Sequence, residues 1–203
     1  DAEGVRIRLT RATGNVSLAG KIVVVDAGHG GKDHGSNRSA VLEKTVALRV
    51  ARELSAQLTA AGATVIMTRD NDVFVPLSAR PSIANRNRAD LFVSCHINST
   101  VGNDRTSGTI TFFHGGKPKS ELLAREIQTE LVKAIGLPNI GVWSDKRIYK
   151  RGGFAVLRPL QMPGVLLELG FVNHSRDRAR MTQPAFPRQA AEAVVRGIRN
   201  YLS

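Results

Sequence analysis

Short apolar runs alternate along this chain with longer segments in which apolar residues recur every three or four positions. The short runs predict strands over residues 21–26, 63–68, 91–95, 108–113 and 164–168. The longer segments predict amphipathic helices over residues 43–61, 78–88, 120–135 and 186–202. Continuously apolar strands that alternate with helices favour an α/β fold with a largely parallel sheet covered on both faces.

The first twenty residues have a different pattern. Val5, Ile7 and Leu9 alternate with small or charged residues, which predicts a half-exposed edge strand. We therefore divide the chain into a lead-in over residues 1–20 and one main domain over residues 21–203. A total of 203 residues is the size of one ordinary α/β domain.

Three of the predicted strands run into unusual polar residues. The first strand leads into a glycine-rich loop that contains His29, the third leads into His96, and the fifth leads into Glu168. The carboxyl ends of neighbouring parallel strands meet at one edge of a sheet, where functional groups gather. Glu43 stands at the start of the first predicted helix, and the loop after His29 can return it to the same edge.

Two histidines, one carboxylate and a water molecule fit a catalytic zinc site, with His29, His96 and Glu43 as the ligands. Zinc binds such donors at about 2.0–2.2 Å and leaves its fourth position open, and it lowers the pKa of a bound water to roughly 7. A further carboxylate must accept the proton without binding the metal itself. We expect Glu168 to be this base, because it follows three apolar residues and burial raises the pKa of a carboxyl.

Each of these residues also has a simpler explanation. A glycine-rich loop after a strand is often only a tight turn or a phosphate-binding loop, which would leave His29 without a metal. His96 could be a core histidine bonded to backbone, and Glu43 could be an acid favoured at a helix start by the dipole. Glu168 is harder to explain in this way, because a glutamate among apolar residues is rarely buried without a partner.

Other polar residues near these positions are candidates for supporting roles. A metal-bound histidine usually donates its other nitrogen to a carboxylate or a carbonyl, and Asp33 and Asp26 are equal candidates for that partner. Arg80 and Asn85 belong to the helix that precedes the His96 strand, and we interpret them as structural rather than catalytic.

The charge balance suggests classes of partner without selecting one. The chain has 29 Lys and Arg against 17 Asp and Glu, which gives a formal net charge of +12. Such an excess favours nucleic acid, an anionic lipid surface or an acidic polymer such as bacterial cell wall. Because aromatic residues make up only 5% of the chain and no nucleic-acid-binding motif is recognisable, we expect no nucleic acid partner. The longest apolar runs are far shorter than the roughly 20 residues that a membrane span needs.

Several blocks of the sequence resemble the signature of a known family. They are Asp26-Ala27-Gly28-His29-Gly30-Gly31, Glu43-Lys44, Thr68-Arg69-Asp70, Leu77-Ser78-Ala79-Arg80, Ser94-Cys95-His96-Ile97-Asn98 and Leu167-Glu168-Leu169-Gly170-Phe171. In this order they resemble the zinc-dependent N-acetylmuramoyl-L-alanine amidases, the amidase-3 family, over nearly the whole chain from Lys21 to Ser203. Mild departures, such as Ser36 where alanine is usual, affect none of the proposed ligands.

The resemblance implies a three-layer αβα sandwich with a mostly parallel, roughly six-stranded sheet, and it makes residues 21–203 the amidase catalytic domain. It implies zinc bound by His29, Glu43 and His96, with Glu168 as the catalytic acid and base. It also implies hydrolysis of the amide between the lactyl group of N-acetylmuramic acid and L-alanine of the stem peptide, in cell-wall remodelling or daughter-cell separation. The rivals are a zinc carboxypeptidase or deacetylase, a nucleic-acid-binding module and an inactive wall-binding relative.

Four further residues are candidates for contact with the substrate, namely Asn98, Arg158, Arg151 and His34. Asn98 lies two positions after His96, and the two arginines lie in or near the stretch 143–154, which mixes cations with aromatic residues. This stretch either lines a groove for acidic stem peptides or forms a solvated basic loop. We expect a monomer that acts on peptidoglycan in the periplasm or at the cell wall, and no signal peptide is visible in this chain.

Overall fold

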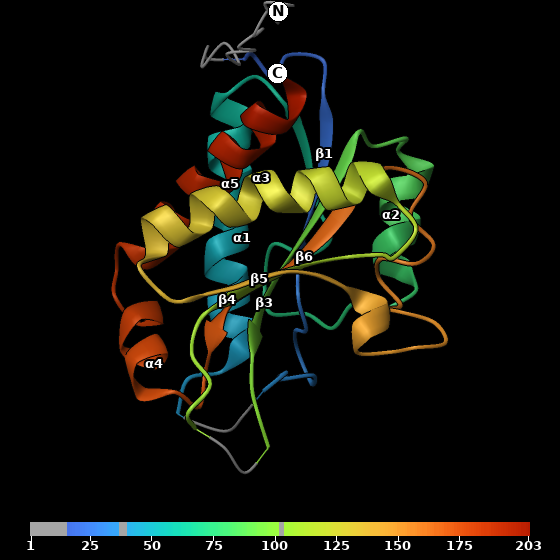
Figure 1. Cartoon of the computed structure of the whole chain (residues 1–203). Helices are drawn as coiled ribbons and strands as arrows, with labels where there is room; N and C mark the ends of the chain where they lie inside the picture. The colour runs from blue at the N-terminus through green and yellow to red at the C-terminus, as the bar shows by residue number, and fades with distance from the viewer. Residues whose placement is uncertain (1–15, 37–39, 102–103) are drawn as a thin grey trace, which may run out of the picture.

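The computed structural model describes residues 16–36, 40–101 and 104–203, and a six-stranded sheet forms its centre (Figure 1). The strands are β1 (Ile22–Ala27), β2 (Thr64–Met67), β3 (Leu91–Asn98), β4 (Thr109–Phe113), β5 (Asn139–Ser144) and β6 (Gly164–Phe171). Their order in the sheet is β2-β1-β3-β6-β4-β5. The strands β2, β1, β3 and β6 run parallel, whereas β4 is antiparallel to β6 and β5 is parallel to β4. The expected mostly parallel, six-stranded sheet is confirmed.

Helices surround this sheet on both faces in the described part of the chain. They are α1 (Glu43–Ala60), α2 (Ala79–Arg86), α3 (Pro118–Ile135), the short 3-10 helix η1 (Asp145–Arg147), α4 (Ser175–Met181) and α5 (Phe186–Leu202). Helices α1, α3 and α5 cover one face, with α3 drawn in yellow across it in Figure 1. The other face is covered by α2 and by the irregular segment 154–163. The expected three-layer αβα sandwich is confirmed, and one of its outer layers is thin.

The alternation of side chains along the strands decides on which face the candidate residues lie. In β3 the odd-numbered residues pack in the core under α1, and the even-numbered residues point toward α2. By the same alternation Asp26, His96 and Glu168 share a face with apolar residues that pack toward α2. Those apolar residues are Val24, Phe92 and Leu166. The candidate residues therefore lie under the thin layer, which leaves room above them for a cleft.

The register of the sheet brings His96 and Glu168 side by side. Their Cα atoms are partners in the β3–β6 ladder. Both residues lie inside their strands, since β3 continues to Asn98 and β6 continues to Phe171, so the predicted strands ended too early. A β-bulge after His96 shifts the register where the two strands reach the edge of the sheet.

Three elements, β5, α4 and the short η1, have no counterpart among the predicted ones. Strand β5 lies at the edge of the sheet, and its residues are half-buried or exposed, so its apolar pattern is weak. Helix α4 is short and mostly charged, and only Asp177 and Met181 are buried in it. Helix α3 begins with Pro118, which suits the first turn of a helix, and ends at Gly136, whose φ of 70° is left-handed.

The lead-in lies mostly beyond the part of the chain that the structure describes. The predicted edge strand with Val5, Ile7 and Leu9 falls outside the described residues. Leu18 is fully buried in the main core, and its N–H donates a hydrogen bond to the carbonyl of Ala61 at 3.1 Å. The packed unit therefore includes Leu18.

Candidate metal centre and cleft

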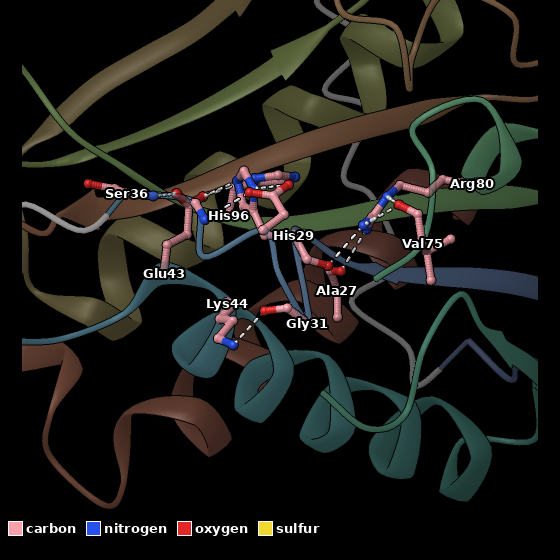
Figure 2. A network of polar contacts seen from close by, with 12 residues as sticks. Ala27, His29, Gly31, Ser36, Glu43, Lys44, Val75, Arg80 and His96 are labelled. Carbon is pink, nitrogen blue, oxygen red and sulfur yellow. Dashed lines mark hydrogen bonds and ion pairs between the residues drawn. The ribbon is translucent and has the colours of Figure 1, made fainter. Parts of the chain in front are cut away.

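Three side chains from the loop after β1, the first turn of α1 and strand β3 meet at one point (Figure 2). Oε1 of Glu43 lies 3.2 Å from Nε2 of His29 and 3.0 Å from Nδ1 of His96. The three candidate ligand atoms all lie within 4.8 Å of one another. A tetrahedral zinc with bonds of ~2.0–2.1 Å separates its ligand atoms by about 3.3 Å. The cluster therefore has the donors and the spacing of a metal centre.

His29 has an unusual backbone conformation that its neighbours maintain. Its φ is 58°, in a left-handed region that costs a residue other than glycine roughly 1–2 kcal/mol. Its carbonyl accepts a hydrogen bond from Nη2 of Arg80 at 2.8 Å, and its Nδ1 lies 2.9 Å from Oδ2 of Asp33. Asp33, and not Asp26, is therefore the carboxylate that orients this imidazole, and Nε2 is left to face Glu43.

Both carboxylate oxygens of Glu43 accept hydrogen bonds from the backbone. Oε1 accepts the N–H of Ile97 at 3.0 Å, and Oε2 accepts the N–H of Ser36 at 2.7 Å. Burial alone would raise the pKa of Glu43, but the two histidines outweigh it and hold the pKa well below its usual 4.5. Burial alone would lower the pKa of His29, whereas the neighbouring carboxylates raise it. Because metals bind neutral imidazole, metal uptake would release protons from this cluster.

Two glycines let the backbone approach the candidate ligands closely. A Cβ at Gly28 would lie 2.3 Å from a ring carbon of His96. A Cβ at Gly35 would lie 2.6 Å from Oε2 of Glu43, and the φ of Gly35 is 65°. The glycines around the first histidine therefore serve the packing of the cluster rather than a phosphate-binding turn.

A fully buried ion pair lies beside this cluster. Asp26 accepts hydrogen bonds from Nη1 of Arg80 at 2.8 Å, from Thr68 at 2.6 Å and from Ser94 at 2.6 Å. Burial alone would raise the pKa of Asp26, but Arg80 and the two hydroxyls hold the pKa below its usual 3.8. Arg80 also donates to the carbonyl of Ala27 at the end of β1 and to that of His29 in the following loop, at 2.8 Å each (Figure 2). Its contacts are those of a structural residue, as the sequence suggested.

Arg69 and Lys44 also tie the loop after β1 to its surroundings, and we did not single them out from the sequence. Arg69 is buried and donates to backbone carbonyls of the β1 end and of α1. The amine of Lys44 lies 2.8 Å from the carbonyl of Gly31 and 2.8 Å from Oδ2 of Asp72. Both residues belong to sequence blocks that resemble the family signature, Glu43-Lys44 and Thr68-Arg69-Asp70, and that position is the signal that could have found them.

Glu168 faces the same cavity without joining the three-residue cluster. Its Oε2 is buried, and it has no hydrogen-bond partner within the described residues. Burial, together with the negative charge of Glu43, raises the pKa of Glu168 well above its usual 4.5. A buried carboxyl with a raised pKa and an uncommitted oxygen is suited to accept and release a proton.

A cleft of about 500 Å³ opens over these side chains. Leu77 and Arg80 line it on the side of α2, which packs on β1. Tyr149 and the segment 153–156 line it on the side of β4, where the Phe154 ring packs against Phe112. Strands β3 and β6 lie between β1 and β4. The cleft therefore has two walls, with His96 and Glu168 at its floor.

The four predicted substrate contacts have different positions relative to this cleft. Asn98 lines it, whereas His34, Arg151 and Arg158 are exposed and are not among the lining residues. Contact of all four with the substrate stays a prediction. Leu77 lines the cleft, and the sequence analysis did not identify it as a candidate. The signal that could have found it is a large apolar side chain in a loop, where it is 58% exposed and does not belong to the core.

Comparisons with known proteins identify a family and similar folds. The sequence model of the amidase-3 family, described as N-acetylmuramoyl-L-alanine amidase, matches residues 23–200. An uncharacterized Bacillus subtilis protein, YqiI, is 38% identical over 186 residues, which cover 91% of this chain and 86% of YqiI. The N-acetylmuramoyl-L-alanine amidase LytC of the same organism is 32% identical over 188 residues, which cover 91% of this chain and 36% of LytC. The crystal structure of an N-acetylmuramoyl-L-alanine amidase from Clostridium difficile 630 matches with a TM-score of 0.83 at 29% identity, covering 92% of this chain and 98% of that one.

Proposed function

This chain belongs to the N-acetylmuramoyl-L-alanine amidase family, and we propose that it is a zinc-dependent hydrolase of peptidoglycan. The bond cut is the amide between the lactyl group of N-acetylmuramic acid and L-alanine of the stem peptide. One observation carries the proposal. His29, Glu43 and His96 converge on one point, and the buried oxygen of Glu168 faces the same cleft.

The residues fit zinc in two respects, the type of their ligand atoms and the hydrogen-bond partner that orients a ligand. Two imidazole nitrogens and one carboxylate oxygen form a typical ligand set for a catalytic zinc, which keeps a fourth position for water or substrate. The Asp33 carboxylate at 2.9 Å from Nδ1 of His29 is the kind of partner that orients a metal-bound histidine. When bound, zinc would polarise the scissile carbonyl and lower the pKa of water.

Glu168 would carry the proton through the reaction. Its carboxylate accepts a proton from the attacking water as the new C–O bond forms at the lactyl carbonyl. It then gives that proton to the alanine nitrogen as the C–N bond breaks, so that a free amino group leaves. Burial of this carboxyl favours the protonated form between the two steps.

The wider setting is proposed on the same basis. The enzyme would act as a monomer in the periplasm or at the cell wall, in remodelling or daughter-cell separation. Its formal charge of +12 would hold it on an anionic wall. No helix in the described ranges combines the length and the apolar character that crossing a membrane requires.

Digestion of purified peptidoglycan tests the reaction and the cofactor together. We expect new L-alanine amino termini and free lactyl groups in equal amounts, loss of both after chelation, and recovery when zinc is added back. Released acetate would indicate a deacetylase, and release of amino acids from the free end of the stem would indicate a carboxypeptidase. Full activity in metal-free enzyme would contradict the zinc proposal.

A further inference from the structure

The two walls of the cleft differ in charge. The segment 146–151, together with Arg158, forms what we call the basic wall, and Tyr149 is its residue that lines the cleft. It carries five exposed cations, Lys146, Arg147, Lys150, Arg151 and Arg158. Within the described residues, none of them forms an ion pair. The segment 70–77 on the other wall carries Asp70 and Asp72, and the latter is paired with Lys44.

The basic wall is built as a defined surface. Its base is Asp145, which is fully buried and accepts hydrogen bonds from the backbone N–H groups of Gly115 at 3.1 Å and Phe154 at 2.8 Å. His114 Nδ1 lies 2.9 Å from the same carboxylate. These contacts join the basic wall to the residues that follow β4. Because the Asp145 carboxylate is occupied by them, within the described range 104–203 it forms no ion pair with the neighbouring cations, which are exposed to solvent.

One aromatic side chain of the basic wall, Tyr149, connects it to the cleft. Tyr149 lines the cleft and contacts Phe154 edge to face at 5.4 Å between ring centroids. The guanidinium of Arg147 lies 3.8 Å from the centre of the Trp143 ring, an arrangement in which the cation keeps its charge. Lys150 and Arg151 directly follow Tyr149.

From this geometry we infer that the cleft binds its substrate in one orientation, with the carboxylates of the stem peptide along the basic wall and the glycan toward the wall of Leu77. The inference rests on the proposed function. The part of the substrate that leaves as the new amine is acidic, whereas the sugar chain is largely neutral. Unpaired cations on one wall, and acids on the other of which one is paired with Lys44, therefore favour one of the two ways of laying the scissile amide across the metal centre.

A charge-matched kinetic comparison tests this orientation. The double variant Lys150→Gln, Arg151→Gln removes two cations of the basic wall. The control Arg125→Gln, Arg188→Gln removes two exposed cations from α3 and α5, which cover the other face of the sheet. Each protein is assayed on a muramyl peptide with free carboxylates and on the same compound with its carboxylates amidated.

We expect the basic-wall variant to raise KM about 3- to 10-fold for the acidic substrate and less than 2-fold for the amidated one, since exposed ion pairs contribute little each. The control should change neither KM by more than 2-fold. Equal losses on both substrates, or an equal loss in the control, would overturn the orientation. Binding of both compounds to zinc-loaded Glu168→Gln, measured by calorimetry, gives the same comparison without turnover. If the wild-type enzyme cleaves neither compound the proposed function fails, and the binding comparison still decides the orientation.

Discussion

Two carboxyl groups, on the strands that flank β3 in the sheet, are buried in opposite ways. Asp26 of β1 is fully buried, and both of its oxygens accept hydrogen bonds, one from Thr68 and Arg80 and the other from Ser94. Glu168 of β6 has a buried oxygen with no partner in the described part of the chain. The pKa of the first carboxyl is lowered and that of the second is raised, although burial acts in the same direction on both.

The difference separates a structural group from a chemical one. A buried carboxylate whose two oxygens both accept hydrogen bonds from the protein stabilises one conformation. A buried carboxyl without partners costs folding free energy, and proteins tend to keep such groups where they have a function. We therefore expect changes at Asp26 to affect stability, and changes at Glu168 to affect turnover.

The largest expected effect is on turnover. Glu168→Gln keeps the shape of the side chain but removes the group that accepts the proton, so kcat on muramyl peptide should fall by roughly 10²- to 10⁴-fold. Zinc content and the free energy of unfolding should stay close to wild type. Glu53→Gln, at an exposed position of α1, is the matched control. Turnover within a few-fold of wild type in Glu168→Gln would remove this residue from the mechanism.

The next effect is on stability. Asp26→Asn leaves the buried guanidinium of Arg80 without its counter-charge, and breaking a buried pair in this way costs about 3–5 kcal/mol. Urea denaturation of the metal-free proteins measures the loss. The double variant with Arg80→Met should be more stable than Asp26→Asn alone, because the uncompensated charge is gone. A loss below about 1 kcal/mol in the single variant would mean that the pair contributes little.

A smaller effect is expected on metal affinity. Asp33→Asn weakens the contact that orients His29, and loss of such an outer partner typically costs 10- to 100-fold in affinity. Competition with a chromophoric chelator measures the zinc dissociation constant, and Asp70→Asn, an exposed acid outside these contacts, is the control. Unchanged affinity in Asp33→Asn would show that the loop backbone alone orients the imidazole.

The smallest expected effect is on the pH dependence of the unfolding free energy, and it appears only at acidic pH. The pKa of Asp26 is lowered in the folded protein from its usual 3.8, so the stability that this carboxylate contributes is fully present above that value. It is lost as the pH falls from 3.8 through the lower pKa of the folded state. The difference in unfolding free energy between wild type and Asp26→Asn should therefore be constant near neutral pH and narrow below 3.8. A gap that widens in acid would contradict the lowered pKa.

The sequence by itself determined the parts of this protein that depend on local pattern. Continuous apolar runs identified five of the strands, and the runs are clearest in strands buried on both faces, such as β1 and β6, because most of their positions are apolar. The polar residues that interrupt such runs, His96 and Glu168, stood out for the same reason, and the structure brings His96 together with His29 and Glu43. Edge strand β5 and helix α4 were not predicted, because few of their residues are buried and their apolar residues do not recur at the spacing of a strand or a helix.

Only the tertiary structure decided which polar group faces which. Asp26 and Asp33 were equivalent from the sequence, but Asp26 points toward α2 and pairs with Arg80, whereas Asp33 curls back to His29. The cleft wall at Leu77 was also invisible, and for the stretch that contains Tyr149 a groove and a solvated loop stayed open, because the two walls come from segments far apart in the chain. Hydrogen bonds and charge interactions act over a few ångströms, so their partners are chosen by how the chain packs and not by separation along it.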